Sequence, residues 1–305
     1  MSDICYLGDD SINSAAMYLI GIMTHFNLSF DRVNSSDSPD ESFTQKPYKL
    51  YIISDYPRER FSDEQLQFIA DSVKAGAGLL MIGGWESYYG RLGEYHKTVL
   101  TDVLPVEMLQ EDDRRNYSQP CVITPCAEHP ITAGLPWNTP PCIGGFNEYK
   151  PKPTGQTIMK IHRFAINQSN DQFEFSPIED KPLLVVGTYG AGNTAALATD
   201  AAPHWVGGFV DWGTQRCIQD LPNGGFIDVG ADYAQFFKQL IEWTMQKYKL
   251  RVTSCERILC GACVSRHSLL ATRNYLNPLS RESQTWSRCS LLNPDPLQTP
   301  EFDRV

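Results

Sequence analysis

The chain has 305 residues, a formal net charge of −10 and a sequence pI near 5.1. Hydrophobic residues make up 42% of it, which excludes a fibrous or wholly disordered protein and predicts a sizeable core. The negative charge disfavours nucleic acid and anionic membranes as partners, because both require a basic face. The sequence also shows no secretion signal and no apolar run of transmembrane length, so we expect a cytoplasmic protein.

The first residues predict a strand, a helix and two further strands. Three short apolar runs are typical of strands, and they are Ile4–Gly8, Leu28–Val33 and Leu50–Ser54. Between the first two runs, Asp9-Asp10-Ser11 offers N-cap side chains to a helix with an apolar face formed by Ile12, Ala15, Ala16, Leu19, Ile20 and Met23. The polar stretch 34–45 is predicted to be a loop.

A second helix and a glycine elbow follow. Ser62 and Gln65 form a capping-box pattern ahead of this helix, and Gly76 is placed to end it. The next apolar strand runs directly into Gly83 and Gly84. Strands alternating with helices predict a doubly wound α/β sheet, in which ligands bind outside the carboxyl ends of the strands. The elbow would overhang that crevice.

The second half of the chain is predicted to be a β-rich elaboration of the same domain. Prolines at positions 105, 120, 125, 130, 136, 140, 141, 151 and 153 divide it into short extended pieces and turns. Two apolar runs, 182–188 and 193–200, flank the turn Tyr189–Gly192 and predict a hairpin. An amphipathic helix over roughly 231–248 would then pack on the sheet.

From about residue 251 the composition becomes rich in Ser and Arg and contains no lysine. We therefore expect one domain over residues 1–248 and a loosely ordered tail over 249–305. The tail carries Cys255, Cys260, Cys263 and Cys289, a spacing known from plant-type [2Fe–2S] ligation. Chance clustering and a zinc site are the alternatives; no ferredoxin-like sequence surrounds these cysteines, and we expect no cofactor. Reduced thiols are expected throughout, since the nine cysteines are odd in number.

Several short motifs are specific as a set although each is weak alone. They are Gly76-x-Gly78-Leu-Leu-Met-Ile-Gly-Gly-Trp-Glu-Ser87, Leu104-Pro-Val106, Asp112-Asp113-Arg114, His129-Pro-Ile131, Gly134-Leu-Pro-Trp137, Leu183-Leu-Val-Val-Gly187, Tyr189-Gly190 with Gly192, and Asp200 with Pro203-His-Trp205. Over roughly residues 1–248 the chain resembles the putative glutamine amidotransferase family of the class I glutamine amidotransferase-like superfamily. Some motifs are also similar to those of ThuA-like proteins and of the middle domain of some β-galactosidases. The resemblance implies a flavodoxin-like, doubly wound and mostly parallel sheet with an elaborated β-rich second half.

The resemblance does not imply amidotransferase activity. That reaction requires a thiolate at the elbow, a histidine to activate it and an acid to orient the histidine. Gly83, Gly84 and Trp85 stand where a related enzyme would present the cysteine. None of the other cysteines up to residue 248 has a strand–turn–helix context, so we expect no active glutamine amidotransferase.

Polar and aromatic residues around the elbow are the candidate site. Aromatic faces beside carboxylates suit sugars, whose C–H faces stack while their hydroxyl groups donate to the acids. The predicted ligand-binding residues are Asp9, Gly83, Gly84, Trp85, Tyr88, Tyr89, Arg91, His129, Asp200 and Trp205. The alternative is that the aromatic residues belong to the core and that the acids cap helices.

Glu86 and His204 are the candidate catalytic residues. Glu86 follows the elbow aromatic directly, and Asp200 with His204 would make a carboxylate–imidazole pair able to act as a general base. A solvated loop glutamate and an Asp-capped turn are the alternatives. A metal site of His129, Asp200 and His204 is a further option, but no known metal-binding spacing is present, so no metal is expected.

Two functions follow from these residues. The first is a binding or assembly module of carbohydrate-related metabolism that takes a small polar molecule. The second is a hydrolase or isomerase of a small polar substrate that uses Glu86 and His204. The absence of a recognisable nucleophile–base pair favours the first. Trp137, Trp205 and Trp212 lie in proline-rich loops and could supply an interface, so we expect a homo-oligomer.

Overall fold

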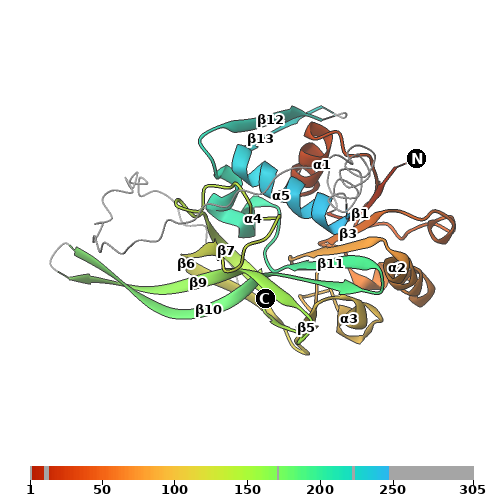
Figure 1. Cartoon of the computed structure of the whole chain (residues 1–305), viewed down its shortest axis with the longest axis horizontal. Helices are drawn as coiled ribbons and strands as arrows, with labels where there is room; N and C mark the ends of the chain where they lie inside the picture. Colours follow the sequence, from red (N-terminus) through yellow and green to blue (C-terminus); the bar gives the residue numbers. More distant parts are fainter. Residues whose placement is uncertain (1, 10–13, 170–171, 222–223, 247–305) are drawn as a thin grey trace, which may run out of the picture. The chain divides into compact units, whose positions relative to one another are not determined.

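The computed structural model describes residues 2–9, 14–169, 172–221 and 224–246 (Figure 1). Among these residues a nine-stranded sheet has the order β2-β1-β3-β4-β11-β10-β9-β6-β7, and two small two-stranded sheets accompany it. The fold is therefore mixed α/β around one large central sheet. The predicted boundary at residue 248, the tail and its four cysteines lie outside the described residues.

Five strands form the parallel half of the sheet: β1 (Ile4–Gly8), β2 (Phe30–Val33), β3 (Leu50–Ser54), β4 (Gly78–Ile82) and β11 (Gly192–Leu197). Every residue of β1, β3, β4 and β11 is buried, as expected for parallel strands covered on both faces. The chain passes from β1 to β2 on one side and then returns to β3 on the other side. This reversal makes the gap between β1 and β3 a topological switch point.

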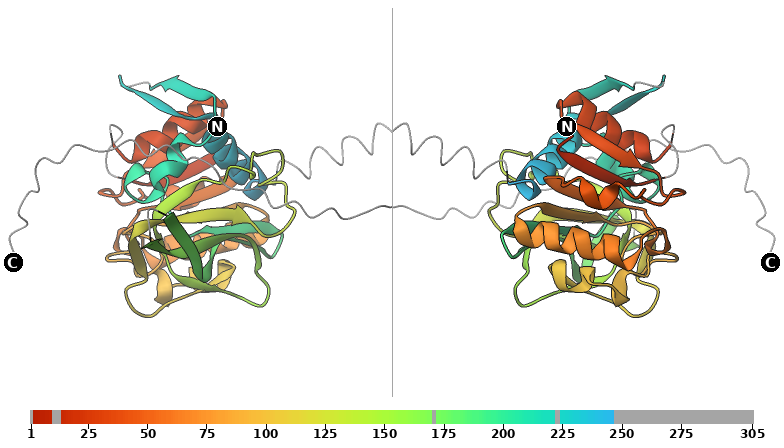
Figure 2. Two further views of the ribbon diagram at one scale, coloured as in Figure 1. Left: turned by 90° about the vertical axis from the view of Figure 1, so that its left-hand side faces the viewer. Right: turned by 90° about the vertical axis from the view of Figure 1, so that its right-hand side faces the viewer.

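Helices cover both faces of the parallel half (Figure 2). α1 (Ala16–His25) and α5 (Ala231–Thr244) lie together on one face, and α2 (Asp63–Ala75) lies with the short α3 (Leu100–Val103) on the other. The predicted capping box is confirmed, because the Gln65 N–H donates to Ser62 Oγ at 3.2 Å and the Ser62 N–H donates to Gln65 Oε1 at 3.0 Å. α4 (Pro203–Val206) and four 3₁₀ turns complete the helices: η1 (Phe43–Gln45), η2 (Arg58–Arg60), η3 (Tyr95–Lys97) and η4 (Gly207–Asp211). Within the described ranges, none of the helices has the length and apolarity needed to span a bilayer.

The remaining strands pair antiparallel. They are β5 (Val106–Met108), β6 (Arg114–Pro125), β7 (Cys142–Asn147), β8 (Tyr149–Pro151), β9 (Gln156–Ser169), β10 (Gln172–Tyr189), β12 (Arg216–Asp220) and β13 (Phe226–Gly230). The predicted hairpin is confirmed, since Tyr189 pairs with Gly192 and Gly190 takes a positive φ of 59° at the turn. The prediction of short pieces fails for β9 and β10, which form a long ribbon.

The ribbon of β9 and β10 continues past two prolines because bulges accommodate them. β10 runs through Pro177 and Pro182, and the register with β9 shifts directly after each of them. Bulges accommodate proline because they interrupt the hydrogen-bond ladder that proline cannot serve. Beyond His162, β9 pairs with β10 but not with β6 in the described register, so the distal part is two-stranded and extends away from the helices (Figure 1).

Candidate functional site

The strands of the parallel half end at one level. Across them, Gly8 pairs with Ser54, Ser54 with Ile82, and Ile82 with Leu197. The chain leaves the sheet immediately afterwards, at Asp9, Asp55, Gly83 and Ala198. We call this level the carboxyl edge. It includes the switch point between β1 and β3, where ligands of open α/β sheets bind.

Three side chains converge at the carboxyl edge. One ligand atom each from Asp55, Asp200 and His204 lies within 4.8 Å of the others. Asp200 is 1% exposed, and its Oδ1 accepts hydrogen bonds from the N–H groups of Ala201 at 2.5 Å and Ala202 at 3.0 Å. Its Oδ2 has no hydrogen-bond partner among the described residues and lies 3.4 Å from His204 Nε2. The predicted Asp200–His204 pair is thus close in space, while Asp55 was not predicted.

Electrostatics sets the charge of this cluster. Burial raises the pKa of Asp200 well above its ordinary value, and the carboxylates of Asp55 and Asp9 raise it further. Burial also lowers the pKa of His204, whose side chain is half-exposed. A carboxyl group that stays neutral does not hold a positive charge on its imidazole neighbour, so both members of the pair favour their neutral forms.

Asp9 and Asp55 flank the switch point in the same unusual conformation. Their φ angles are 49° and 44°, in the left-handed region that few residues other than glycine adopt. The Tyr6 hydroxyl donates to Asp9 Oδ2 at 2.5 Å, and the Arg32 guanidinium donates to the carbonyl oxygen of Asp9. Asp55 Oδ1 accepts from the N–H of Glu86 at 2.7 Å. Asp55 therefore connects the loop that carries Glu86, a predicted catalytic residue, to the carboxyl edge.

The elbow has no space for a nucleophilic side chain. A Cβ atom on Gly83 would lie 2.0 Å from the carbonyl oxygen of Ala198, and one on Gly84 would lie 2.1 Å from Asp55 Oδ1. Burial raises the pKa of four thiols, those of Cys5, Cys121, Cys126 and Cys217, so none of these four is an activated thiolate. Gly83 and Gly84 therefore leave no room at the elbow for a thiol side chain.

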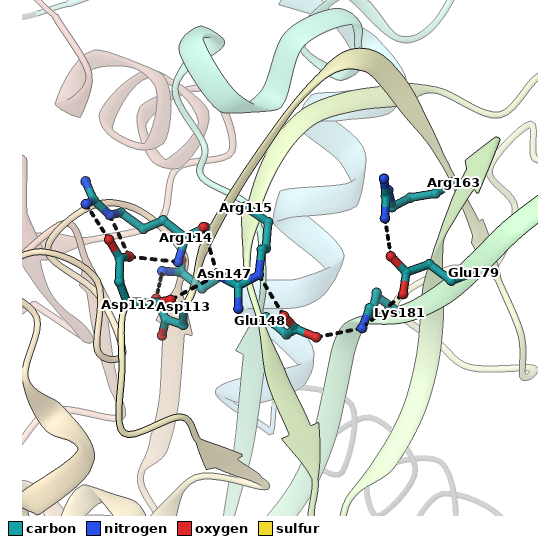
Figure 3. Close-up of polar contacts among 9 residues, drawn as sticks. All are labelled: Asp112, Asp113, Arg114, Arg115, Asn147, Glu148, Arg163, Glu179 and Lys181. Carbon is teal, nitrogen blue, oxygen red and sulfur yellow. Dashed lines mark hydrogen bonds and ion pairs between the residues drawn. The ribbon is translucent and has the colours of Figure 1, made fainter. Parts of the chain in front are cut away.

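A buried polar pair, Asp113 and Asn147, contacts the elbow; Figure 3 shows the hydrogen bond between the two side chains. Asp113 is fully buried, and its carboxylate accepts from the N–H groups of Tyr89 and Gly90 at 3.0 Å each and from Asn147 Nδ2 at 2.8 Å. Asn147 in turn accepts from the Gly84 N–H at 2.8 Å and donates to the Gly84 carbonyl at 3.1 Å. Asp113 of the Asp112-Asp113-Arg114 motif thus holds the loop that follows β4 by hydrogen bonds.

Several predicted ligand-binding aromatic residues are occupied by internal contacts. Tyr88 is fully buried, and its hydroxyl lies 3.0 Å from the carbonyl oxygens of Met81 and Leu197. Trp205 is also buried and donates from Nε1 to Asn116 Oδ1 at 2.7 Å. Trp85 is 41% exposed, with the guanidinium of Arg114 4.9 Å from its ring centroid.

Tyr89 has a different environment. It lines a surface pocket of about 510 Å³ together with Arg58, Glu94 and His96, on loops that follow β3 and β4. The rings of Tyr89 and His96 lie 4.7 Å apart at an interplanar angle of 35°. Burial lowers the pKa of His96, which therefore favours the neutral form. The predicted Arg91 is exposed beside this loop, and its N–H donates to the Trp85 carbonyl at 2.7 Å.

His129 lies apart from the other predicted site residues. Its ring packs edge-on against Trp243 at 4.9 Å, and the Trp243 carbonyl accepts from Asn193 near the start of β11. Asp200 follows the other end of that strand. The grouping of His129 with Asp200 and His204, considered as an option from the sequence, is therefore not formed, because the 126–137 loop packs on α5.

Comparison with known proteins places the chain in a family. The family model described as putative glutamine amidotransferase matches residues 49–219. The cytoplasmic protein STM1381 from Salmonella typhimurium LT2 is similar over 66% of this chain and 89% of its own, with 28% identity and a TM-score of 0.54. The cytoplasmic protein STM3548 from Salmonella typhimurium is similar over 79% and 98%, with 23% identity and a TM-score of 0.60.

A ThuA-like protein from Bacteroides uniformis is a more distant match, similar over 65% of this chain and 82% of its own, with 12% identity and a TM-score of 0.39. No curated protein matches the sequence at a significant level. The family model covers more than half of the residues and includes the elbow, the Asp113–Asn147 pair and the Asp200–His204 pair. The chain belongs to the putative glutamine amidotransferase family.

Proposed function

We propose that this protein is a cytoplasmic binding module that uses a flavodoxin-like, amidotransferase-type domain without its nucleophile. Its ligand is a small polar molecule of carbohydrate character, bound at the carboxyl edge. The observation that carries this proposal is the convergence of Asp55, Asp200 and His204 beside an elbow that excludes any side chain. Carboxylate oxygens accept from hydroxyl groups, and a sugar offers several hydroxyl groups at once.

The pocket at Tyr89 supports the same class of ligand. Its volume of about 510 Å³ falls within the range of small-molecule sites, and the Tyr89 ring offers a flat face for the C–H side of a sugar. Arg58 and Glu94 add a donor and an acceptor to the lining. The pocket lining does not include Asp55, Asp200 or His204, so we propose that a ligand bound at the carboxyl edge extends into the pocket.

A binding screen tests this proposal. Neutral hexoses, disaccharides, acyclic polyols and glutamine are titrated into the full chain, and binding is followed by calorimetry and by the melting temperature. We expect saturable binding of one or more polyhydroxyl compounds, weakened about fivefold in Tyr89→Ala, since stacking on one ring contributes on the order of 1 kcal/mol. Tyr189→Ala is the matched control, because Tyr189 lies at the hairpin turn of β10 and β11. Absence of saturable binding in the whole panel would refute the proposal.

The proximity of Asp200 and His204 favours a second candidate function. A neutral imidazole 3.4 Å from a carboxyl group can accept a proton from a substrate, so a hydrolase or isomerase using His204 and Glu86 is the alternative. Turnover of any compound that binds, lost in His204→Gln and in Glu86→Gln, would support this alternative. Binding without turnover would support the binding module.

We also propose that the protein is a homo-oligomer and that the distal ribbon is its contact surface. Four large apolar side chains are exposed there: Ile166 (38%), Phe173 (55%), Phe175 (62%) and Ile178 (53%). Ile166 and Phe175 pair across the two strands and share one face. An isolated two-stranded ribbon is only marginally stable in water, and a second copy of the same ribbon would cover its apolar face by two-fold symmetry.

Light scattering after gel filtration measures the mass in solution. The wild type should be a dimer or larger, whereas Phe173→Glu with Phe175→Glu should be a folded monomer. Glu174→Gln changes the neighbouring exposed residue and serves as the control. A monomeric wild type would contradict the proposal.

A further inference from the structure

We propose that Asp55, Asp200 and His204 bind a divalent transition-metal ion at the carboxyl edge. Asp200, after β11, and His204, on the short helix α4, are close along the chain, and Asp55, after β3, joins them only in the folded chain. The metal requires these three side chains alone. The inference shares its location with the proposed function but does not need the organic ligand.

The geometry suits a metal ion. A metal with ligand bonds of about 2.0–2.2 Å brings its ligand atoms to roughly 3–4 Å from one another. The ligand atoms of Asp55, Asp200 and His204 are all within 4.8 Å of one another, and Asp200 Oδ2 lies 3.4 Å from His204 Nε2. Side-chain rotations that move the ligand atoms toward one another by up to about 1–2 Å would bring all three into this range.

A buried atom without a partner points to a ligand. Asp200 is 1% exposed, yet its Oδ2 has no hydrogen-bond partner among the described residues, while its Oδ1 accepts from two N–H groups. Buried acceptors are nearly always satisfied in folded proteins, so an unpaired carboxylate oxygen calls for an ion or molecule opposite it. The two N–H groups fix the orientation of the carboxyl group and hold Oδ2 toward His204.

The charges around the cluster favour a cation. The carboxylates of Asp55 and Asp9 both act electrostatically on Asp200 at the carboxyl edge. The Arg32 guanidinium donates hydrogen bonds to the carbonyl oxygens of Gly8 and Asp9, at the end of β1. The hydroxyl of Tyr6 is taken by Asp9, and that of Tyr233 donates to the Ala201 carbonyl. A divalent ion would displace the proton of Asp200 and compensate the negative charge of the resulting carboxylate and of Asp55.

The donor set indicates which ions fit. Two carboxylates and one imidazole suit manganese, iron or zinc better than calcium, which prefers six or more oxygen ligands. Three protein ligands leave open positions, and the half-exposed His204 places them toward solvent. Such an ion could bind water or two neighbouring hydroxyl groups of a ligand.

The test uses Mn²⁺ alone on the full chain after treatment with a chelator. Manganese is chosen because it binds cysteine thiolates weakly, so the cysteines of the chain do not compete for it. Electron paramagnetic resonance measures free Mn²⁺ and thereby counts the bound ions, and Zn²⁺ competition follows. We expect one bound ion per chain in the wild type and a rise in melting temperature on binding.

The variants are His204→Ala and the isosteric Asp200→Asn. Loss of a direct ligand should weaken Mn²⁺ binding by more than the roughly 10–100-fold typical of losing a partner outside the ligand set. His25→Ala is the matched control, because His25 is exposed at the end of α1. Failure of the wild type to bind Mn²⁺ or Zn²⁺, or unchanged binding in His204→Ala, would overturn the inference. Neither result depends on the carbohydrate screen, so the two proposals fail separately.

Discussion

Replacement of Asp113 should be among the most damaging single changes in the described part of the chain. Asp113→Ala removes three hydrogen bonds, accepted from Tyr89 N–H, Gly90 N–H and Asn147 Nδ2. Gly90 and Asn147 are buried, so their donors lose their partner without gaining water. Each orphaned buried donor costs about 1–3 kcal/mol, so we expect a total loss of about 3–5 kcal/mol. The melting temperature should fall by on the order of 10 °C.

Asp113→Asn should be less damaging than Asp113→Ala, because it keeps part of the hydrogen bonding. Oδ1 accepts from both Gly90 and Asn147, whereas Oδ2 accepts only from Tyr89, which is partly exposed. An amide whose oxygen takes the place of Oδ1 keeps two of the three bonds, so the cost should be about 1–2 kcal/mol. Asp112→Asn is the control, because that side chain is 52% exposed in its ion pair with Arg114. Urea unfolding followed by tryptophan fluorescence measures all three variants, and equal losses for Asp113→Ala and Asp112→Asn would refute the reasoning.

Two further predictions concern the strands and the loop on α5. Burial alone would raise the pKa of Glu148, but hydrogen bonds from Lys181 and Arg115 lower it (Figure 3). A depressed carboxylate pKa stabilises the fold above the unfolded value of about 4.3, and that contribution is lost as pH falls through the folded value. Glu148→Gln should therefore cost about 1–2 kcal/mol at neutral pH in urea unfolding, and the difference from wild type should shrink in acid; a pH-independent difference would contradict this. Gln239 Nε2 lies 2.9–3.1 Å from three carbonyl oxygens of the 130–133 segment. Gln239→Leu should lower the urea midpoint by the equivalent of about 2 kcal/mol, and an unchanged midpoint would show that the loop is held elsewhere.

Local signals in the sequence were sufficient for much of the fold. The runs Ile4–Gly8 and Leu50–Ser54 are bounded by turn residues, and the structure begins and ends β1 and β3 at the same residues. The capping box and the hairpin at Tyr189–Gly192 each depend on residues a few positions apart. The ribbon of β9 and β10 escaped prediction because Pro177 and Pro182 ordinarily argue against a strand, and the bulges that accommodate them depend on the partner strand.

The candidate site depends on register, which a single sequence does not reveal. Asp200 and His204 are four positions apart, so their proximity could be expected. Asp55 belongs with them because Ser54 pairs with Ile82 and Ile82 with Leu197, and these pairings are fixed only when the sheet forms. The sequence signal that could have identified Asp55 was its position, as an acid directly after a buried strand. His129 illustrates the opposite case, since its loop is drawn to α5 by contacts that no short motif encodes.

A thiol restored at the elbow should not produce an amidotransferase. The Cβ of Gly84→Cys would lie 2.1 Å from Asp55 Oδ1, which accepts from the Glu86 N–H, so the new side chain would displace Asp55 from its loop. Its thiol would also stand beside carboxylates, which raise a thiol pKa and oppose the thiolate that glutamine hydrolysis requires. We expect no release of ammonia from glutamine by Gly84→Cys and weaker Mn²⁺ binding than in the wild type. Ammonia release that disappears in Gly84→Cys combined with His204→Ala would show instead that the edge retains a working general base and lacks only its nucleophile. The close approach of Asp55 to Gly84 favours the first outcome, because glycine here makes room for an acid.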